Sequence, residues 1–243
     1  FANSIRAMRR HEIERIGLAW MSGVIDDEAS LAGMTDVYDA AIEASLQWAI
    51  QHRINDIQID EAPAAIAIIG MGRYGGREVN FSSDADVIII YRPAEGADDD
   101  QANLFARKVQ EDLRAILQGP TTFEPKIELD MDLRPEGKNG PLVRSYASCE
   151  EYYRSWASTW EHQALLRARY AAGDASLAED FLMNVADPLR YPKIDLTETQ
   201  IAEIRKLKAR MEAERLPRGV RRDRHLKLGK GGLSDVEWTI QLL

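Results

Sequence analysis

The sequence predicts an α+β fold in which helical segments flank a small mixed sheet. Helical spacing of apolar residues marks both ends of the chain, and two short apolar runs, separated by a glycine-rich stretch, mark its middle. These patterns divide the chain into an N-terminal helical segment (1–60), a core with the sheet (61–147) and a C-terminal helical region (148–243). The helical pattern is still running at residue 243, so we expect a longer parent protein.

The N-terminal segment is expected to form two helices. Over residues 4–20, apolar side chains recur at roughly helical spacing, at Ile5, Met8, Ile13 and Ile16. Thr35 is expected to cap the second helix, because a threonine hydroxyl can accept a bond from a free N–H of the first turn. The apolar face of that helix comprises Val37, Ala41, Ile42, Leu46, Ala49 and Ile50.

The core is expected to begin with two buried strands. Ala64–Gly70 is a short apolar run that ends in glycine, and Asp86–Tyr91 is rich in β-branched residues. A tight backbone turn joins them. An amphipathic helix then follows the polar loop 96–100 and ends at Gly119-Pro120.

A third strand is predicted over Ile127–Leu133, where apolar and acidic residues alternate strictly. Side chains alternate between the two faces of a strand, so the carboxylates share one face. The acidic face holds Glu128, Asp130 and Asp132, and the apolar face holds Ile127, Leu129, Met131 and Leu133.

The C-terminal region is expected to be helical. Ser148 and Glu151 are expected to form a capping box that opens a long, broken helix running to Gly173. A second such pair, Thr197 and Gln200, opens another helix, and a last helical pattern covers residues 236–243.

Composition excludes several classes of protein. With 31 Lys and Arg against 40 Asp and Glu, the net charge of −9 argues against a nucleic-acid partner, because counterion release needs clustered positive charge. Apolar runs are too short for a transmembrane helix, so no membrane partner is expected. The single cysteine, Cys149, rules out an internal disulfide and suits a reducing cytoplasm.

Charge is unevenly distributed along the chain. Residues 205–230, the basic strip, hold eleven basic and three acidic residues, a local balance of +8. The strip fits either a solvated helix with a basic loop or a docking strip for an anion, and composition does not choose between them.

Asp84 and Asp86 form the strongest chemical signal, at the entry to the second strand. Two carboxylates at i and i+2 on an extended segment point the same way, and both stay ionised only if a cation compensates them. Such oxygen ligands suit Mg²⁺, which keeps substrate phosphates and waters as further ligands. A third carboxylate on the neighbouring strand, Asp130, would complete a site for two ions, and Asp132 shares its face.

The Gly75-Gly76 turn precedes these aspartates and can expose N–H groups to a phosphate chain, because no Cβ blocks the approach. Each piece is weak alone, but the combination favours metal-dependent nucleotidyl transfer, in which one ion activates the attacking oxygen and the other stabilises pyrophosphate. The chain has no P-loop motif. GMGRYG, residues 70–75, is discounted as a dinucleotide motif because no helix-forming stretch follows it.

Four blocks carry a more specific resemblance: GMGRYGGREVNFSSDAD, ELDMDLRPEGKNGPLVRS, STWEHQALLRARYAAGD and KLGKGGLSDVEWTIQ. Together, from Gly70 to Gln241, they resemble the glutamine synthetase adenylyltransferase family. The resemblance implies a polymerase-β-like nucleotidyltransferase core flanked by a helical bundle. Members of the family carry two homologous halves. One removes AMP from a glutamine synthetase tyrosine by phosphorolysis, and the other adds AMP from ATP.

The WEHQ sequence resembles the C-terminal, adenylylating half more closely. ATP and glutamine synthetase are then the implied substrates, and a PII-type nitrogen signalling protein is a candidate further partner. Two alternatives stay open. The removing half would use phosphate as nucleophile and release ADP, whereas a non-catalytic regulatory module would bind nucleotide and dock a partner through the basic strip.

By motif, the resemblance implies Asp84, Asp86 and Asp130 as catalytic ligands of two Mg²⁺ ions. Asp132 stands where the family often has arginine, which leaves open whether Asp130 or Asp132 is the third ligand. The tyrosine hydroxyl of the substrate has an ordinary pKa near 10. Asp130 is a candidate base that would assist its attack.

The resemblance also implies that Gly75, Gly76 and Ser83 contact the triphosphate. Arg134 would pair with a phosphate or anchor a buried carboxylate, and the two roles are equally supported.

Two further blocks have a structural and a functional interpretation. The first is the WEHQ block, with Trp160, Glu161 and His162. A structural role, in which these residues pack on a helix and form a buried ion pair with Arg167 or Arg169, is at least as well supported as a catalytic role. Glycines before a helix start could bind an anion or simply make a tight turn, and that block comprises Gly231, Gly232, Asp235 and Glu237.

Overall fold

The structure of the chain, a computed structural model, describes residues 1–120, 123–193, 196–216 and 219–241. It shows a mixed α+β fold around a five-stranded sheet, as the sequence predicts. The strand order is β3-β2-β1-β5, with β4 also paired to β2. The strands are β1 (Ala64–Gly70), β2 (Ala85–Pro93), β3 (Leu129–Asp130), β4 (Val143–Ser145) and β5 (Arg169–Gly173).

Strand pairing makes the sheet mixed. β1 pairs antiparallel with β2 on one side and with β5 on the other, whereas β3 and β4 both pair parallel with β2. β1 coincides with the first predicted strand, and β2 extends the second one at both ends.

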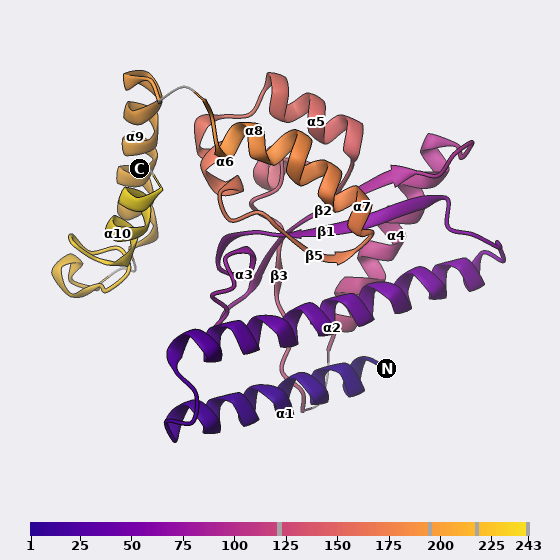
Figure 1. The fold of residues 1–243 in the computed structure, drawn as a ribbon, viewed down its shortest axis with the longest axis horizontal. Helices are drawn as coiled ribbons and strands as arrows, with labels where there is room; N and C mark the ends of the chain where they lie inside the picture. The colour runs from indigo at the N-terminus through magenta and orange to yellow at the C-terminus, as the bar shows by residue number, and fades with distance from the viewer. Residues whose placement is uncertain (121–122, 194–195, 217–218, 242–243) are drawn as a thin grey trace.

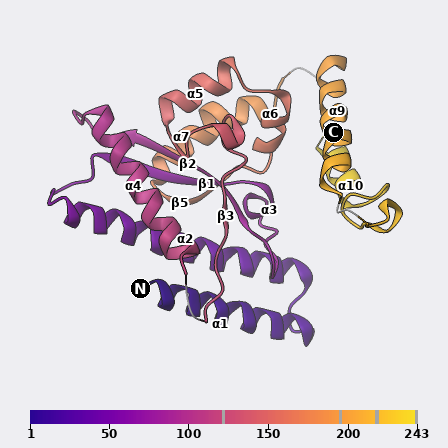
Figure 2. The ribbon, with the colours of Figure 1, turned by 180° about the vertical axis from the view of Figure 1, so that it is seen from behind.

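Helices cover both faces of the sheet (Figures 1 and 2). One face carries α1 (Ala2–Met21), α2 (Asp27–Asp56) and α4 (Asp99–Gln118). The other carries α5 (Tyr146–Ser155), α6 (Thr159–Leu165), α7 (Ala175–Phe181), the π-helical turn η2 (Leu182–Ala186) and α8 (Asp187–Arg190). The single turn α3 (Gly72–Gly75) follows β1, and α9 (Glu198–Arg215) and α10 (Leu233–Ile240) stand to one side of both layers. Short 3-10 turns occupy η1 (Gly137–Asn139) and η3 (Arg222–Arg224).

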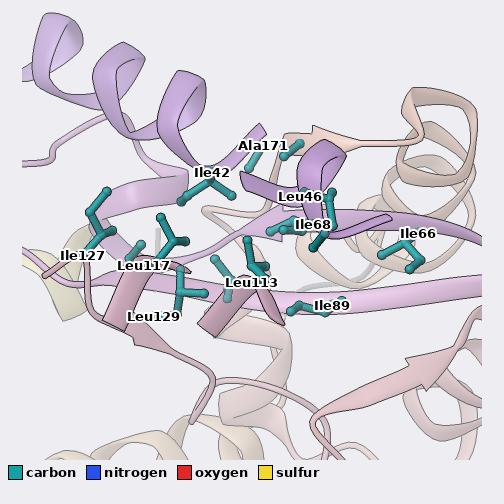
Figure 3. Packing of buried hydrophobic residues seen from close by; sticks show 14 of the residues in the cluster. Ile42, Leu46, Ile66, Ile68, Ile89, Leu113, Leu117, Ile127, Leu129 and Ala171 are labelled. Carbon is teal, nitrogen blue, oxygen red and sulfur yellow. The ribbon is translucent and has the colours of Figure 1, made fainter. Parts of the chain in front are cut away.

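The central strands divide their side chains between two apolar clusters, because successive residues of a strand point to opposite faces. Ile66 and Ile68 of β1 face α1, α2 and α4, whereas Ile69 faces α5 and α7. Figure 3 shows the first cluster, in which Ile42 and Leu46 of α2 and Leu113 and Leu117 of α4 close over the sheet. Cys149 is buried in the second cluster, as a packed helix residue.

The predicted cap at Thr35 is wrong. The second helix begins after Asp26, whose carboxylate accepts a bond of 2.8 Å from the N–H of Ala29. Asp27 and Glu28 favour that earlier start, because acidic side chains stabilise the first turn of a helix. Thr35 lies inside the helix, and its hydroxyl donates to the Leu31 carbonyl, which is how a threonine in the middle of a helix satisfies its own polar group.

The broken helix predicted from Ser148 to Gly173 is confirmed only in its first part, as α5 and α6, and its start and its last residues are wrong. Ser145, rather than Ser148, caps α5, and residues 169–173 form the strand β5 against β1. Alanine favours helices, but the free edge of β1 offers a row of backbone hydrogen bonds. Ala171 and Ala172 are buried against α2 and β1, so tertiary packing overrides local propensity.

The third strand is shorter than predicted. Ile127, Leu129 and Met131 are buried as the alternation requires, but only Leu129–Asp130 pairs with β2. The N–H of Arg134 donates to the Met131 carbonyl, and this turn ends the extended segment. Leu133 consequently packs into the second cluster.

The remaining predicted helices are confirmed where the structure describes them. α4 begins after Asp98 and ends before Gly119. α9 opens with the capping box of Thr197 and Gln200. α10 begins slightly before the predicted last helix, whose final residues 242–243 lie outside the described part of the chain. None of the described helices combines the length and the apolar character needed to span a membrane.

Candidate functional site

Three aspartates from two neighbouring strands meet at the start of β2. Asp84 directly precedes the strand, Asp86 is its second residue, and Asp130 stands beside Asp86 in the parallel β2–β3 register. The N–H of Ala85 donates to the carbonyl of Glu128 over 2.8 Å and helps to hold that register. The structure therefore brings together the three carboxylates predicted as metal ligands.

Electrostatics confirm that these carboxylates interact. The pKa of Asp86 is raised from the ordinary 3.8 to about 7, first by burial and then by the charges of Asp84 and Asp130. Lys227 and Arg73 oppose this shift through their positive charges. Without added positive charge, a proton on Asp86 is the way in which the three groups relieve their repulsion near neutral pH.

Gly72, which follows β1, is held directly against the Asp86 carboxylate. Its φ is +51°, and a Cβ at this position would lie 2.2 Å from Oδ2 of Asp86. Only glycine fits both the backbone conformation and the close approach. The sequence reasoning missed Gly72, although the glycine pair around Met71 was a signal that the backbone comes close to another group there.

The Gly75-Gly76 pair closes the single helical turn α3, which lies within GMGRYG, and no helix follows this motif between Gly76 and β2, as expected. The N–H of Gly75 donates to Met71 over 2.6 Å and that of Gly76 donates to Gly72 over 3.0 Å, so both have partners inside the protein. A Cβ on Gly75 would lie 2.0 Å from the Arg167 carbonyl oxygen, which explains this glycine by packing. Contact of the pair with a triphosphate stays a prediction.

Arg169 of β5 ties the glycine turn to the N-terminal helices. Its guanidinium makes two bonds to the Asp39 carboxylate of α2, at 2.9 and 3.0 Å, and also donates to the carbonyls of Tyr74 and Gly75. The sequence does not predict this role, because its pattern indicates a helix over residues 169–173 and nothing local points to Asp39.

The loop before Asp84 is anchored from two sides. The Ser83 hydroxyl donates to the side chain of Asn80 and accepts from its N–H, each over 3.0 Å. The Ser83 carbonyl accepts a bond from the Tyr38 hydroxyl, which in turn accepts one from Arg9. The Ser83 hydroxyl is thus engaged within the loop, and its contact with a triphosphate stays a prediction.

Asp130 and Asp132, the two candidates for the third ligand, have different surroundings. Oδ1 of Asp130 accepts a bond of 2.7 Å from the N–H of Asp132, which orients Asp130 beside Asp86. Asp132 instead pairs with Lys138, with 3.1 Å between the two charged atoms. This geometry favours Asp130 as the carboxylate that acts together with Asp86.

Arg134 is buried, but its guanidinium donates to backbone carbonyls. The acceptors are Met131, Lys138 and Gly140, at 2.8 to 3.1 Å. Arg134 therefore braces the loop after β3, a role that neither of its predicted functions described.

A cavity of about 870 Å³ opens between α1, the loop 81–84 and the segment around β3. Asp84, Asp130 and Asp132 line it together with basic side chains. The basic lining residues are Arg9, Arg10, Arg114, Lys126, Arg134 and Lys138. A space that carries both signs of charge beside the aspartates can hold a phosphate chain and its cation.

The aspartates suit Mg²⁺ by their chemistry, since oxygen donors and uncompensated negative charge are what this ion requires. Over the described ranges, no group of three or more His, Cys, Asp or Glu side chains is already arranged to hold a metal ion. Mg²⁺ keeps several waters and substrate phosphates among its ligands, so a site completed by substrate fits this donor set.

The WEHQ block lies on the helix α6, as its structural interpretation predicts, but in the described part of the chain Glu161 does not form the expected ion pair with Arg167 or Arg169. Glu161 is buried, and it accepts bonds from the Tyr152 hydroxyl and the Ser158 N–H. The expected ion pairs are made elsewhere, because Arg167 pairs with Glu78 and Arg169 pairs with Asp39.

The last block forms the start of α10. The N–H of Gly231 donates to the Asp235 carboxylate over 2.6 Å, and Lys208 of the basic strip also contacts Asp235. Glu237 lies 3.7 Å from Arg167, beside the glycine turn. Gly231, Asp235 and Glu237 of the block are thus engaged in contacts within the protein.

The sequence is similar to known proteins along its whole length. Residues 1–184 match the family described as GlnE, glutamate-ammonia ligase adenylyltransferase. The chain is 78% identical over 243 residues to a bifunctional glutamine synthetase adenylyltransferase/adenylyl-removing enzyme of Bifidobacterium longum (strain DJO10A). It is 48% identical over 238 residues to the protein of the same description from Mycobacterium tuberculosis (strain CDC 1551 / Oshkosh). These matches cover 100% and 98% of this chain but only 23% and 24% of the relatives.

Proposed function

The chain belongs to the glutamate-ammonia ligase adenylyltransferase family, and we propose that it moves AMP from ATP to a tyrosine hydroxyl of glutamine synthetase. Pyrophosphate is the other product. The observation that carries this proposal is the register that sets Asp86 beside Asp130, with Asp84 two residues before Asp86. A polymerase-β-like core and a cytoplasmic location belong to the same proposal.

Asp84, Asp86 and Asp130 would hold Mg²⁺ in this mechanism. When bound, the ions neutralise charge on the triphosphate and increase the acidity of the attacking hydroxyl. Asp130 accepts the tyrosine proton, and the N–H of Asp132 keeps the Asp130 carboxylate oriented.

The substrate tyrosine oxygen forms a bond to the α-phosphorus of ATP. The bond from that phosphorus to the bridging oxygen breaks, and pyrophosphate leaves with the electron pair. The protein contributes position and charge, since no residue forms a covalent intermediate.

The WEHQ block supports the adenylylating direction. The basic strip supports an acidic partner, ATP or a surface of glutamine synthetase, because the charge of Lys227 within it already acts on Asp86. A PII-type signalling protein is the proposed regulator, as in the family resemblance.

The test incubates the 243-residue chain with glutamine synthetase, Mg²⁺ and ATP labelled on the α-phosphate. Label should pass to glutamine synthetase with the wild type and should not pass with Asp84→Asn or Asp86→Asn. Asp60→Asn is the matched control. This aspartate is exposed and precedes the first residue of β1, at the end of the strand away from the candidate site.

Other outcomes of these assays would identify the alternative functions or refute the site. Loss of label from adenylylated glutamine synthetase, only when phosphate is added, would show the removing activity. Mg²⁺-dependent ATP binding without transfer in either direction would show a regulatory module. Near-normal transfer by the Asp84 or Asp86 variant would refute the assignment of the site.

A further inference from the structure

Arg9 of α1 is a buried cation whose polar groups are incompletely satisfied. The residue is 6% exposed, and its Nη2 donates to the Tyr38 hydroxyl over 2.7 Å. Its guanidinium carbon lies 5.0 Å from the centre of the Tyr38 ring. In the described part of the chain it has no carboxylate partner, and its buried Nε has no hydrogen-bond acceptor.

Two neighbouring arginines of the same helix have hydrogen-bond or ion-pair partners for their guanidinium groups. Arg6 is fully buried, but it donates to the carbonyls of Ile116 and Gly119 at the end of α4. Arg10 pairs with Glu14 and Glu124. Arg9 differs from both, because within the described residues no carboxylate pairs with its charge and its buried Nε lacks an acceptor. A buried charge that is only partly satisfied is costly unless a group outside the chain completes it.

Arg9 lines the 870 Å³ cavity that Asp84 also lines. The Tyr38 hydroxyl connects the two walls, since it accepts from Arg9 and donates to the carbonyl of Ser83, the residue before Asp84. The same cavity is lined by Lys126, which is exposed, and by Arg114 of α4. A ligand in this cavity could therefore contact both Arg9 and the wall that carries Asp84.

We propose that Arg9 forms a phosphoryl-anion subsite in this cavity, for the phosphate group bonded to, or attacking, the α-phosphorus. The inference rests on the proposed function and deepens it. A guanidinium offers a planar set of donors that matches phosphate oxygens, and its charge persists at every relevant pH.

One subsite serves both directions of the chemistry. In adenylylation, the subsite holds the β-phosphate of ATP, which leaves in pyrophosphate as the tyrosine oxygen bonds to the α-phosphorus. In removal, an oxygen of inorganic phosphate bonds to the α-phosphorus, the bond to the tyrosine oxygen breaks, and ADP and the protonated tyrosine result. Either way the phosphate lies on the side of the α-phosphorus opposite the tyrosine.

The test measures binding of inorganic phosphate and of pyrophosphate to the 243-residue chain by calorimetry, at constant Mg²⁺ and without ATP or glutamine synthetase. Arg9→Gln should weaken binding of at least one anion by roughly tenfold or more, the usual range for a lost charged hydrogen bond. Arg15→Gln is the matched control, because this exposed arginine lies on the same helix, outside the cavity lining, and pairs with Glu12. Its affinity should equal that of the wild type.

Folding of each variant is checked by its thermal unfolding midpoint. If Arg9→Gln does not fold, Arg9→Lys and Tyr38→Phe replace it. The lysine keeps the charge but loses the planar donors, and the phenylalanine removes the hydroxyl that holds Arg9 in place. Both should weaken anion binding by several-fold.

Unchanged affinity for both anions in Arg9→Gln, or in both replacement variants, would overturn the proposal. So would a wild type that binds neither anion at millimolar concentration. Loss of pyrophosphate binding alone identifies the triphosphate of ATP as the occupant, and loss of phosphate binding alone identifies the nucleophile of removal. Failure of AMP transfer with Arg9-dependent anion binding intact would contradict the proposed function and leave the anion subsite standing.

Discussion

The hydroxyl of Tyr38 donates a hydrogen bond of 2.9 Å to the backbone carbonyl of Ser83. This bond joins the second helix of the chain to the loop that delivers Asp84. The same loop packs on α1 through Phe81, since a Cβ on Gly17 would lie 3.0 Å from the Phe81 ring. The N-terminal helices therefore help to form the candidate site.

Tyr38→Phe tests this relationship. The variant keeps the buried ring and removes one hydroxyl that makes two bonds, so the free energy of unfolding should fall by about 1–2 kcal/mol. AMP transfer should fall several-fold because the loop that holds Asp84 is less fixed. Chemical unfolding and label transfer measure the two effects. Transfer at the wild-type rate, in a folded variant, would show that the Tyr38 bond does not position the site.

Gly72→Ala should damage the site more than the fold. The new methyl group would have to displace the Asp86 carboxylate, and alanine is strained at a φ of +51°. We expect a loss of about 1–3 kcal/mol in the free energy of unfolding and at least a hundredfold loss of transfer.

Gly96→Ala provides the matched control for that change. Gly96 also has a positive φ, +76°, but nothing lies within 4 Å of its added Cβ. The Gly96→Ala variant should lose a similar amount of unfolding free energy as Gly72→Ala, but it should keep its AMP-transfer activity. Equal activity in the two variants would argue that close contact between Gly72 and Asp86 is unimportant.

Asp86→Asn should change how stability depends on pH. The pKa of Asp86 rises from 3.8 to about 7 on folding, so the folded chain binds more protons than the unfolded chain between these values. This stabilising contribution is complete below pH 3.8, declines as pH rises, and is lost above about 7.

The asparagine variant cannot ionise at this position. At pH 8 without Mg²⁺, the free energy of unfolding of the variant should exceed that of the wild type by on the order of 1–3 kcal/mol. This difference in stability should become smaller toward pH 4. Urea unfolding at both pH values measures it. Mg²⁺ should stabilise the wild type at pH 8 more than the variant. A pH-independent difference would contradict the raised pKa.

Arg169→Gln should loosen the glycine turn. The change removes a partly buried, two-bond pair with Asp39 and leaves that carboxylate without the partner, at a cost of about 2–4 kcal/mol. Arg77→Gln is the control, because its pair with Asp36 is exposed and should contribute less than 1 kcal/mol. Thermal unfolding distinguishes them, and equal losses would contradict this ranking.

Much of the fold follows from local patterns. The apolar runs at Ala64–Gly70 and Asp86–Tyr91 form strands, and the pair Thr197 and Gln200 opens a helix, because hydrophobic spacing and capping act over a few residues. Domain boundaries at residues 60 and 147 stay predictions. The errors at Thr35 and at residues 169–173 arose where a longer helix or a free strand edge changed the preferred local structure.

Some features of the candidate site likewise follow from local sequence patterns, and others follow only from the tertiary structure. The sequence alone predicted that Asp84 and Asp86 belong to one site, because strand geometry sets the direction of residues two apart. Arg9 stands four residues from Ile5 and from Ile13, on the apolar face of its helix, and that spacing was a signal of its burial. Its contact with Tyr38, the choice of Asp130 beside Asp86, and the Arg169–Asp39 pair required the folded chain. These contacts join residues 29 to 130 positions apart, and no local pattern specifies which distant side chains packing will bring together.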